Sequence, residues 1–262
     1  MSKFAPVNAA DGCAWVTGAS SGIGRAVALA LACDGWRVAV SARGQDGLTS
    51  LVQESAGLKG SIHPYPLDVA HQQEVADAYA AISRDLGPVA LAVLNAGIYV
   101  PVEITGKLDP APFAHSMQVN YMGVVHCLAP LLSQLMARRR GHVVIVSSVT
   151  GYGGLPRAAA YGPTKAALIN LAESLKFDLD RTGVNISVVC PGFVDTPATA
   201  NNPFPMPFLR PVDIAARRIL AGIQGGDFEI TFPRRFTYAL KFLNMLPYQL
   251  YFRLVKRITG WN

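Results

Sequence analysis

The chain has 262 residues, of which 51% are hydrophobic and only 15% are charged. This length and composition exclude a disordered chain and are typical of a protein with a full apolar core. The whole net charge of +6 lies in residues 230–262, which contain six Lys and Arg and no Asp or Glu, so the rest of the chain is electrically balanced.

Short β-rich runs alternate with longer helical patterns along the chain. The predicted strands are 14–18, 37–42, 61–67, 89–96, 141–148, 185–192 and 228–232. The predicted helices lie near 22–34, 45–56, 71–86, 110–138, 156–182 and 211–224. This alternation, with strands apolar on both faces, predicts an α/β fold with a parallel sheet between two layers of helices. Right-handed crossovers then give a doubly wound sheet, and we expect a single domain over 1–262.

Cysteines and histidines are scattered along the sequence. Cys13, Cys33, Cys127 and Cys190 lie in apolar contexts without metal-like spacing, so we expect buried free thiols and no metal site. The N-terminal segment lacks the apolar run of a signal peptide. The sequence also contains no uncharged apolar run of 18 residues or more, so we expect no membrane-spanning helix. We therefore expect a cytoplasmic protein.

The first predicted strand leads directly into a glycine-rich turn, TGASSGIG, at 17–24. A strand, a glycine turn and a helix start let backbone N–H groups and the helix dipole bind a pyrophosphate. The spacing is GxxxGxG at Gly18, Gly22 and Gly24, not the commoner GxGxxG, so an ordinary strand-to-helix turn is the alternative. The context favours a dinucleotide site.

The end of the second predicted strand, VAVSARG, bears on which dinucleotide binds. NAD sites usually place an acid there for the ribose 2′-hydroxyl, whereas an arginine accommodates a 2′-phosphate. Ala42 stands at the position of the acid and Arg43 follows it. Guanidinium geometry suits phosphate. A solvated loop charge is the alternative for Arg43, but the missing acid favours NADP(H), with Ser41 assisting.

Tyr161 and Lys165 lie one helical turn apart in the sequence YGPTK, so their side chains project from one helix face. A phenol titrates near pH ~10, and a neighbouring ammonium favours the phenolate and lowers that pKa. The pair is either a proton-transfer device or part of a polar helix face. The spacing alone leaves both interpretations open.

Further motifs occur in order along the chain: LDV at 67–69, NAG at 95–97, VN at 119–120, VSS at 146–148 and PGFVDT at 191–196. With the glycine turn and YGPTK, they make the chain resemble the short-chain dehydrogenase/reductase family over a core of about 12–225. The resemblance implies a Rossmann-type sheet of seven strands, a nicotinamide cofactor and a Ser–Tyr–Lys site with an assisting Asn. The main departure is Leu94, where the family usually has Asn.

The resemblance also implies a catalytic role for four residues. Ser148, thirteen residues before Tyr161, would bind the reacting oxygen, while its neighbour Ser147 points to the opposite face of an extended strand. Tyr161 would exchange a proton with that oxygen. Lys165 would keep the pKa of the phenol low and bind the nicotinamide ribose, and Asn120 would hold a water that connects Lys165 to solvent.

By the same resemblance and the turn chemistry, one set of residues is expected to contact the cofactor. Asp68 would bind the adenine, and Thr196 would lie near the nicotinamide carboxamide. The full set is Gly18, Ser20, Ser21, Gly22, Ile23, Gly24, Ser41, Arg43, Asp68, Val69, Asn95, Ala96, Gly97, Tyr161, Lys165, Pro191, Gly192, Val194 and Thr196.

The segments 98–110, 151–156 and 197–210 lie outside the motifs and are expected to select the substrate. The last is either a substrate lid or a fixed surface loop. Apolar side chains here, among them Tyr99, Val100 and Tyr152, indicate a hydrophobic carbonyl or alcohol. We expect an NADP(H)-dependent oxidoreductase, and the alternative is a catalytically silent dinucleotide-binding regulatory or scaffold protein.

The C-terminal segment 234–262 alternates apolar with basic residues, and Pro247 is expected to divide it into two short helices. It would pack on the body or on a second subunit, or else lie in an anionic membrane interface. Nucleic acid is not expected, because no stacking platform or basic groove is evident elsewhere. Apolar stripes in the helices at 110–138 and 156–182 would support a homodimer or homotetramer, or face the core.

Overall fold

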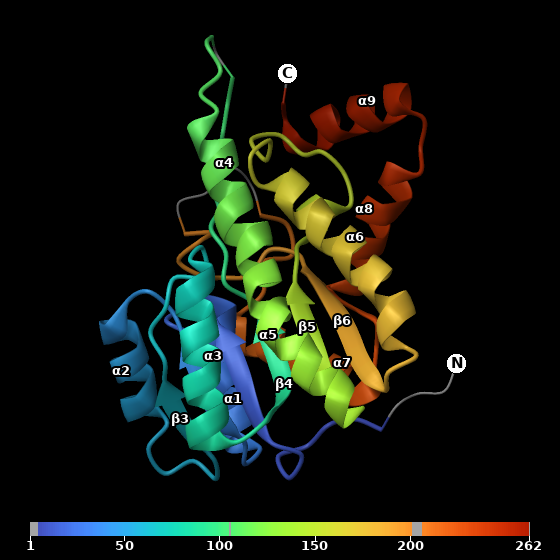
Figure 1. Cartoon of the computed structure of the whole chain (residues 1–262). Coiled ribbons are helices and arrows are strands. Elements are labelled where there is room, and N and C mark those ends of the chain that lie inside the picture. The colour runs from blue at the N-terminus through green and yellow to red at the C-terminus, as the bar shows by residue number, and fades with distance from the viewer. Residues whose placement is uncertain (1–4, 105, 201–205, 262) are drawn as a thin grey trace.

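The sheet has seven parallel strands in the order β3-β2-β1-β4-β5-β6-β7 (Figure 1). The computed structural model describes residues 5–104, 106–200 and 206–261. The strands are β1 (Cys13–Thr17), β2 (Arg37–Ser41), β3 (Ser61–Pro64), β4 (Val89–Leu94), β5 (Gly141–Val146), β6 (Val184–Pro191) and β7 (Glu229–Phe232). The predicted doubly wound α/β fold is confirmed.

Helices cover both faces of the sheet. One face carries α1 (Gly22–Cys33), α2 (Gln45–Glu54) and α7 (Val212–Gly225), whose buried side chains share a core with one face of β1. The opposite face carries α3 (Gln72–Leu86), α5 (Gly123–Arg138) and α6 (Gly162–Leu179). The short helix α4 (Ala111–Met117) precedes α5 in the chain. Alternate residues of β1 supply the two cores: Ala14 and Val16 face the first, and Cys13 and Trp15 the second.

The strand order reverses between β1 and β4, which are hydrogen-bonded neighbours. In an open parallel sheet the loops after two such strands leave in opposite directions and open a crevice at their carboxyl ends. The glycine turn follows β1, the NAG sequence follows β4 and Ser148 lies just beyond β5. The fold therefore brings these three motifs to one edge of the sheet.

Two predicted helices differ from the structure. The helix expected at 156–182 begins only at Gly162, because Arg157 has a left-handed φ of 59° that interrupts a helix. The helix expected at 110–138 contains a π-helical segment at Gln118–Met122, between α4 and α5. Such a segment often marks a functional site, and here it contains Asn120.

The segment 111–138 is also long and apolar enough to be considered as a membrane span, although the sequence predicted none. Half of its most apolar stretch is buried inside the protein. Leu128, Leu131 and Leu135 belong to the core on that face of the sheet, so the segment has the packing of a core helix.

The C-terminal segment forms two helices, α8 (Arg234–Asn244) and α9 (Tyr248–Thr259), and Pro247 immediately precedes α9 as predicted. The hydroxyl of Tyr251 donates to the carbonyl of Gly154 at 2.6 Å, so α9 is attached to the loop after β5. Figure 1 shows the C-terminus at the same end of the molecule as α4. This end contains the carboxyl edge of the sheet.

One expectation about the thiols is wrong. Cys13, Cys127 and Cys190 are buried and free, but Cys33 is free and exposed, because it is the last residue of α1 and lies outside the buried face of that helix.

Candidate active site

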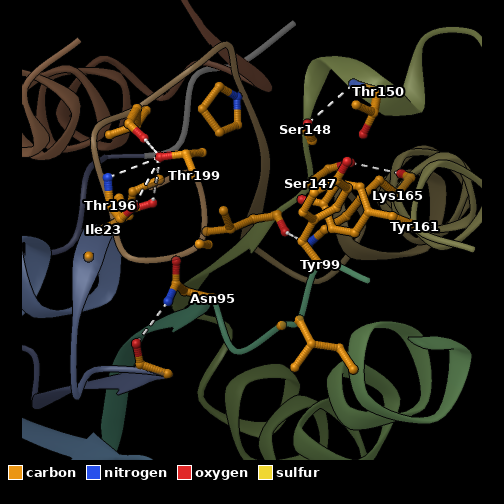
Figure 2. Close-up of a pocket in the computed structure, with 18 of the residues that line it drawn as sticks. Ile23, Asn95, Tyr99, Ser147, Ser148, Thr150, Tyr161, Lys165, Thr196 and Thr199 are labelled. Atoms are coloured by element: carbon orange, nitrogen blue, oxygen red, sulfur yellow. Dashed lines mark hydrogen bonds between the residues drawn. The ribbon is translucent and has the colours of Figure 1, made fainter. Parts of the chain in front are cut away.

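A pocket of about 960 Å³ opens at the carboxyl edge of the sheet. Figure 2 shows Ser148, Tyr161 and Lys165 on one side of it and Asn95, Thr196 and Thr199 on the other. The predicted cofactor residues that line it are Gly18, Ser20, Ser21, Gly22, Ile23, Ser41, Arg43, Asp68, Val69, Asn95, Ala96, Gly97, Tyr161, Lys165, Pro191, Gly192, Val194 and Thr196. Ser148 also lines it, whereas Gly24 and Asn120 do not.

Tyr161 lies immediately before α6 and faces the pocket. Burial among protein atoms raises the pKa of its phenol to about 12, and hydrogen bonding with the Ser148 side chain opposes that rise. The ring of Tyr99 packs edge-on against it, with the centroids 5.2 Å apart. The phenol is therefore protonated at neutral pH and can act as a proton donor.

Lys165 is in the first turn of α6 and is only 3% exposed. Its Nζ donates to the carbonyl of Val146 at 2.9 Å and lies 5.5 Å from the ring centroid of Tyr161. Burial lowers its pKa to about 8. Burial therefore moves the pKa of Tyr161 up and that of Lys165 down, and the predicted lowering of the phenol pKa by Lys165 stays a prediction.

The two adjacent serines have different environments. Ser147 is buried, and its Oγ donates to the backbone carbonyl of Lys165 at 2.8 Å, which attaches the end of β5 to α6. Ser148 faces the pocket, and its Oγ accepts from the N–H of Thr150 at 3.2 Å. The Ser148 hydroxyl also hydrogen-bonds with the phenol of Tyr161, whereas the Ser147 hydroxyl is used within the fold. Ser148 is therefore the serine placed to donate, together with Tyr161, to a molecule in the pocket.

Asn120 is fully buried in the π-helical segment. Its Nδ2 donates to the carbonyl of Ile98 at 3.0 Å and to Oγ1 of Thr164 at 3.1 Å, and its Oδ1 accepts from the N–H of Ile98 at 2.7 Å. The side chain thus fixes the chain after β4 against α6. A Cβ at Gly97 would lie 3.2 Å from Oδ1 and 3.5 Å from Nζ of Lys165, so a glycine there lets these segments pack closely. The water-holding role of Asn120 stays a prediction.

The glycine turn is packed against the end of β4. Gly18 has a φ of +66°, and an added Cβ would lie 2.9 Å from Nδ2 of Asn95. That amide donates to the carbonyls of Thr17 and Gly18 at 3.1 Å each. A Cβ on Gly24 would lie 2.4 Å from the carbonyl oxygen of Gly18. Gly24 therefore lets α1 pack closely against the turn, and its predicted contact with the cofactor stays a prediction.

The end of β2 brings Ser41 and Arg43 to the far end of the pocket. The Oγ of Ser41 accepts from Nε1 of Trp15 at 3.0 Å, and Ser41 is fully buried between strands. Arg43 is exposed, and among the described residues no hydrogen bond or ion pair is formed by its side chain. Asp68 lies nearby after β3, and its Oδ1 accepts from the N–H of Ala70 at 3.0 Å.

Sequence reasoning missed a wall of the pocket formed by the C-terminal helices. Its residues are Phe236, Leu240, Ile258, Thr259 and Trp261. Arg157 connects this wall to the loop after β4: its guanidinium donates to Glu103 at 2.7 and 3.0 Å and lies 5.4 Å from the ring centroid of Trp261. The apolar periodicity of 234–262 shows that its helices bury a face, but not which surface they cover.

The substrate segments agree only in part with their prediction. Tyr99 lines the pocket, but Val100 and Tyr152 do not, and the Tyr152 hydroxyl donates to Glu229 at 2.7 Å. Of the predicted lid at 197–210, residues 201–205 lie outside the described part of the chain. Pro197, Ala198, Thr199 and Pro207 line the pocket. In the described residues there is no group of three or more His, Cys, Asp or Glu that could hold a metal ion.

Comparison with known proteins places these features in a family. Residues 12–204 match the family described as short chain dehydrogenase. An uncharacterized oxidoreductase of Myxococcus xanthus is 36% identical over 94% of this chain and 96% of its own length. A 3-oxoacyl-(acyl-carrier-protein) reductase of Thermotoga maritima is 30% identical over 72% of this chain and 76% of its own. The crystal structure of a 3-ketoacyl-ACP reductase from Sinorhizobium meliloti is 26% identical, covers 84% of this chain and 95% of its own, and superposes with a TM-score of 0.75.

Proposed function

Because the chain belongs to the short-chain dehydrogenase family, which makes it an oxidoreductase that uses a nicotinamide dinucleotide, we propose that it is an NADP(H)-dependent reductase of apolar carbonyl compounds. The observation that carries this proposal is the meeting of Ser148, Tyr161 and Lys165 on one wall of a large pocket that begins at a glycine turn. A protein that only binds a dinucleotide needs neither the serine nor the tyrosine.

The residues fit a dinucleotide. Gly18 and Gly22 both have left-handed φ values, and their lack of Cβ atoms leaves the backbone of the turn open to a phosphate at the start of α1. A Cβ on Gly22 would lie 3.2 Å from Thr196, so this glycine keeps the passage between the turn and the loop after β6 open. A bound cofactor would lie between Arg43 and Lys165, and it would supply or accept the hydride.

The chain's own residues then handle the charge and the proton. In reduction, negative charge develops on the substrate oxygen, and Ser148 and Tyr161 can donate hydrogen bonds to it from one wall of the pocket. Tyr161 is protonated at neutral pH because its pKa is raised, so it can give its proton to that oxygen. Lys165, one turn along α6, provides a buried cation beside the phenol.

The choice of NADP(H) is supported by Arg43. It lines the pocket beyond β2, carries no partner among the described side chains, and lies at the start of α2, where the helix dipole also favours an anion. The second strand has no acidic residue at the position that would bind a ribose 2′-hydroxyl. A 2′-phosphate satisfies both features.

An apolar substrate is supported by the composition of the remaining wall. Beyond Tyr161 the pocket is bounded by aromatic and aliphatic side chains of Tyr99, Phe193, Phe236, Leu240 and Trp261. Two of the similar proteins are named for reducing ketoacyl groups, and a ketone on a long apolar chain fits such a wall. By analogy with the family, we also propose a homo-oligomer formed through α5 and α6. A cytoplasmic location agrees with four thiols that form no disulfide.

The test is the oxidation of NADPH, followed by its absorbance, with a panel of ketones, aldehydes, steroids and acyl-chain carbonyls. We expect turnover with apolar members of the panel and slower turnover when NADH replaces NADPH. NADPH binding without oxidation by any class would instead support the catalytically silent alternative. Faster turnover with NADH would overturn the assignment of Arg43 while leaving the reaction class intact.

A further inference from the structure

Large exposed apolar side chains are concentrated on the C-terminal helices, which also form one wall of the pocket. Those on the C-terminal helices are Tyr238, Phe242, Met245, Tyr248, Leu250, Phe252 and Ile258. Four more lie on the loops after β4 and β6: Ile104, Leu108, Phe208 and Leu209. Elsewhere in the described residues only Met117, Met136 and Phe177 are comparably exposed. A concentration of exposed apolar side chains on one segment is typical of an interaction site.

The exposed side chains of α8 form a stripe. Tyr238, Phe242 and Met245 are spaced four and three residues apart, so they share one helix face, and they are 53, 63 and 81% exposed. Beyond Pro247 the stripe continues with Tyr248, whose ring stacks on that of Phe252 with the centroids 6.0 Å apart. We call these five residues the apolar stripe. It faces away from the residues of α8 that line the pocket, Phe236 and Leu240.

The charges around the stripe are of one sign. Residues 230–262 contain no Asp or Glu. Lys241 pairs with Glu229 of β7, but the remaining basic residues of the two helices are exposed: Arg234, Arg235, Arg253, Lys256 and Arg257. The helices therefore combine exposed aromatic rings with a row of cations, which is the composition of a helix that lies in an anionic membrane interface.

We propose that α8 and α9 dock the mouth of the pocket onto an anionic lipid bilayer, with the apolar stripe in the headgroup region and the exposed arginines and Lys256 on the lipid phosphates. A second copy of the chain is a poor occupant, because a symmetric contact would bring two sets of like charges together. An acidic protein would satisfy the charges, but it gives no reason for so much exposed aromatic surface.

The position of the stripe has a functional consequence, which rests on the proposed function. Leu240 of α8 and Ile258 of α9 line the pocket, while the same helices carry the stripe on their outer side. Trp261 follows α9 and is held by Arg157 beside the opening. An apolar carbonyl compound dissolved in the bilayer would then enter the pocket without crossing water. The docking itself is independent of any activity and is tested without it.

The experiment is co-sedimentation of the full-length chain with two kinds of vesicle, phosphatidylcholine alone and phosphatidylcholine mixed with an equal amount of phosphatidylglycerol. We expect binding to the mixed vesicles that weakens with added salt, and little binding to the neutral ones. The variant Phe242→Ser/Tyr248→Ser should bind at least tenfold more weakly, because the two most exposed rings of the apolar stripe are removed. Arg253→Gln/Arg257→Gln should lose roughly fivefold per charge.

Phe177→Ser is the matched control, because it removes a phenyl ring that is 77% exposed on α6, away from the pocket opening. It should bind vesicles like the wild type, and size-exclusion chromatography of every variant separates lipid contact from subunit assembly. The proposal is overturned by an absence of binding to the mixed vesicles, by equal binding to both kinds, or by unchanged binding of the Phe242/Tyr248 variant. It is also overturned if that variant dissociates an oligomer, since the stripe would then be a subunit contact.

Discussion

Replacing Lys165 by methionine should stabilise the protein while removing most of its activity. The ammonium is almost completely buried, its one hydrogen bond goes to the carbonyl of Val146, and burial lowers its pKa from the ordinary 10.5 to about 8. A buried charge kept at such a cost, where a methionine of similar length would pack, is expected at a functional position.

The size of this stabilisation follows from the linkage between proton binding and folding. A pKa of about 8 in the folded chain against 10.5 in the unfolded one means that the charged lysine costs about 3 kcal/mol of stability at pH 7. The methionine removes this cost, but it also loses the hydrogen bond to Val146, which reduces the gain in stability by about 1 kcal/mol. Lys165→Met should therefore raise the free energy of unfolding by about 2 kcal/mol, which corresponds to roughly 4 °C in Tm for a chain of this size.

The stabilisation by Lys165→Met should depend on pH. The folded state binds this proton less tightly than the unfolded state, so the cost to the wild type is complete below pH 8 and disappears as the pH rises towards 10.5. The difference in unfolding free energy between Lys165→Met and the wild type should therefore decrease by about 2 kcal/mol between pH 7 and about pH 9.5. Denaturant unfolding at the two pH values, wild type against variant, measures it.

Lys176→Met is the control, because Lys176 lies on the same helix but pairs with Asp180 at the surface. It should change the free energy of unfolding by less than about 1 kcal/mol, equally at both pH values. The reasoning is refuted if Lys165→Met is less stable than the wild type at pH 7, or if its advantage is the same at both pH values.

Three further predictions concern single residues. Arg43→Ala should weaken NADPH binding about 10–100-fold, through the loss of a charge-assisted contact to phosphate, and leave NADH binding unchanged; fluorescence titration tests both, and equal losses would contradict the role of Arg43. Ser148→Ala should lower kcat by about 10²–10³. Ser147→Ala should instead cost about 1–3 kcal/mol of unfolding free energy, with a smaller effect on kcat. Steady-state kinetics and denaturation test both, and the reverse pattern would assign the catalytic role to Ser147. Gly24→Ala should destabilise by about 1–3 kcal/mol because its Cβ meets the Gly18 carbonyl, while Gly44→Ala enters open space; equal Tm values for the two variants would exclude that clash.

The sheet was predictable because its signals are local. Each strand is a short apolar run and each crossover a longer periodic segment, and these patterns depend only on neighbouring residues. The different roles of the two serines also follow from the alternation of an extended chain. Both line the pocket, but the Ser147 hydroxyl is used in a hydrogen bond to α6. The ends of elements are less certain, because Arg157 adopts a left-handed conformation that nothing in its neighbourhood predicts.

The remaining features depend on contacts between distant segments. Trp261 and Arg157 are over a hundred residues apart in sequence, yet they meet at the pocket opening. The spacing of Tyr161 and Lys165 places a cation near a phenol but says nothing about how deeply the surrounding protein buries them, and burial decides both pKa values. The exposure of Cys33 likewise depends on which face of α1 meets the sheet.

The most direct test of the proposed chemistry is the single-turnover rate of Tyr161→Phe with NADPH and an apolar ketone, together with its dissociation constant for NADPH. Only the hydroxyl group of Tyr161 is removed, so NADPH binding should stay within about threefold of the wild type. The rate should fall by about 10²–10⁴, the usual contribution of a positioned acid. A rate that stays near the wild-type value would contradict the claim that Tyr161 supplies the proton.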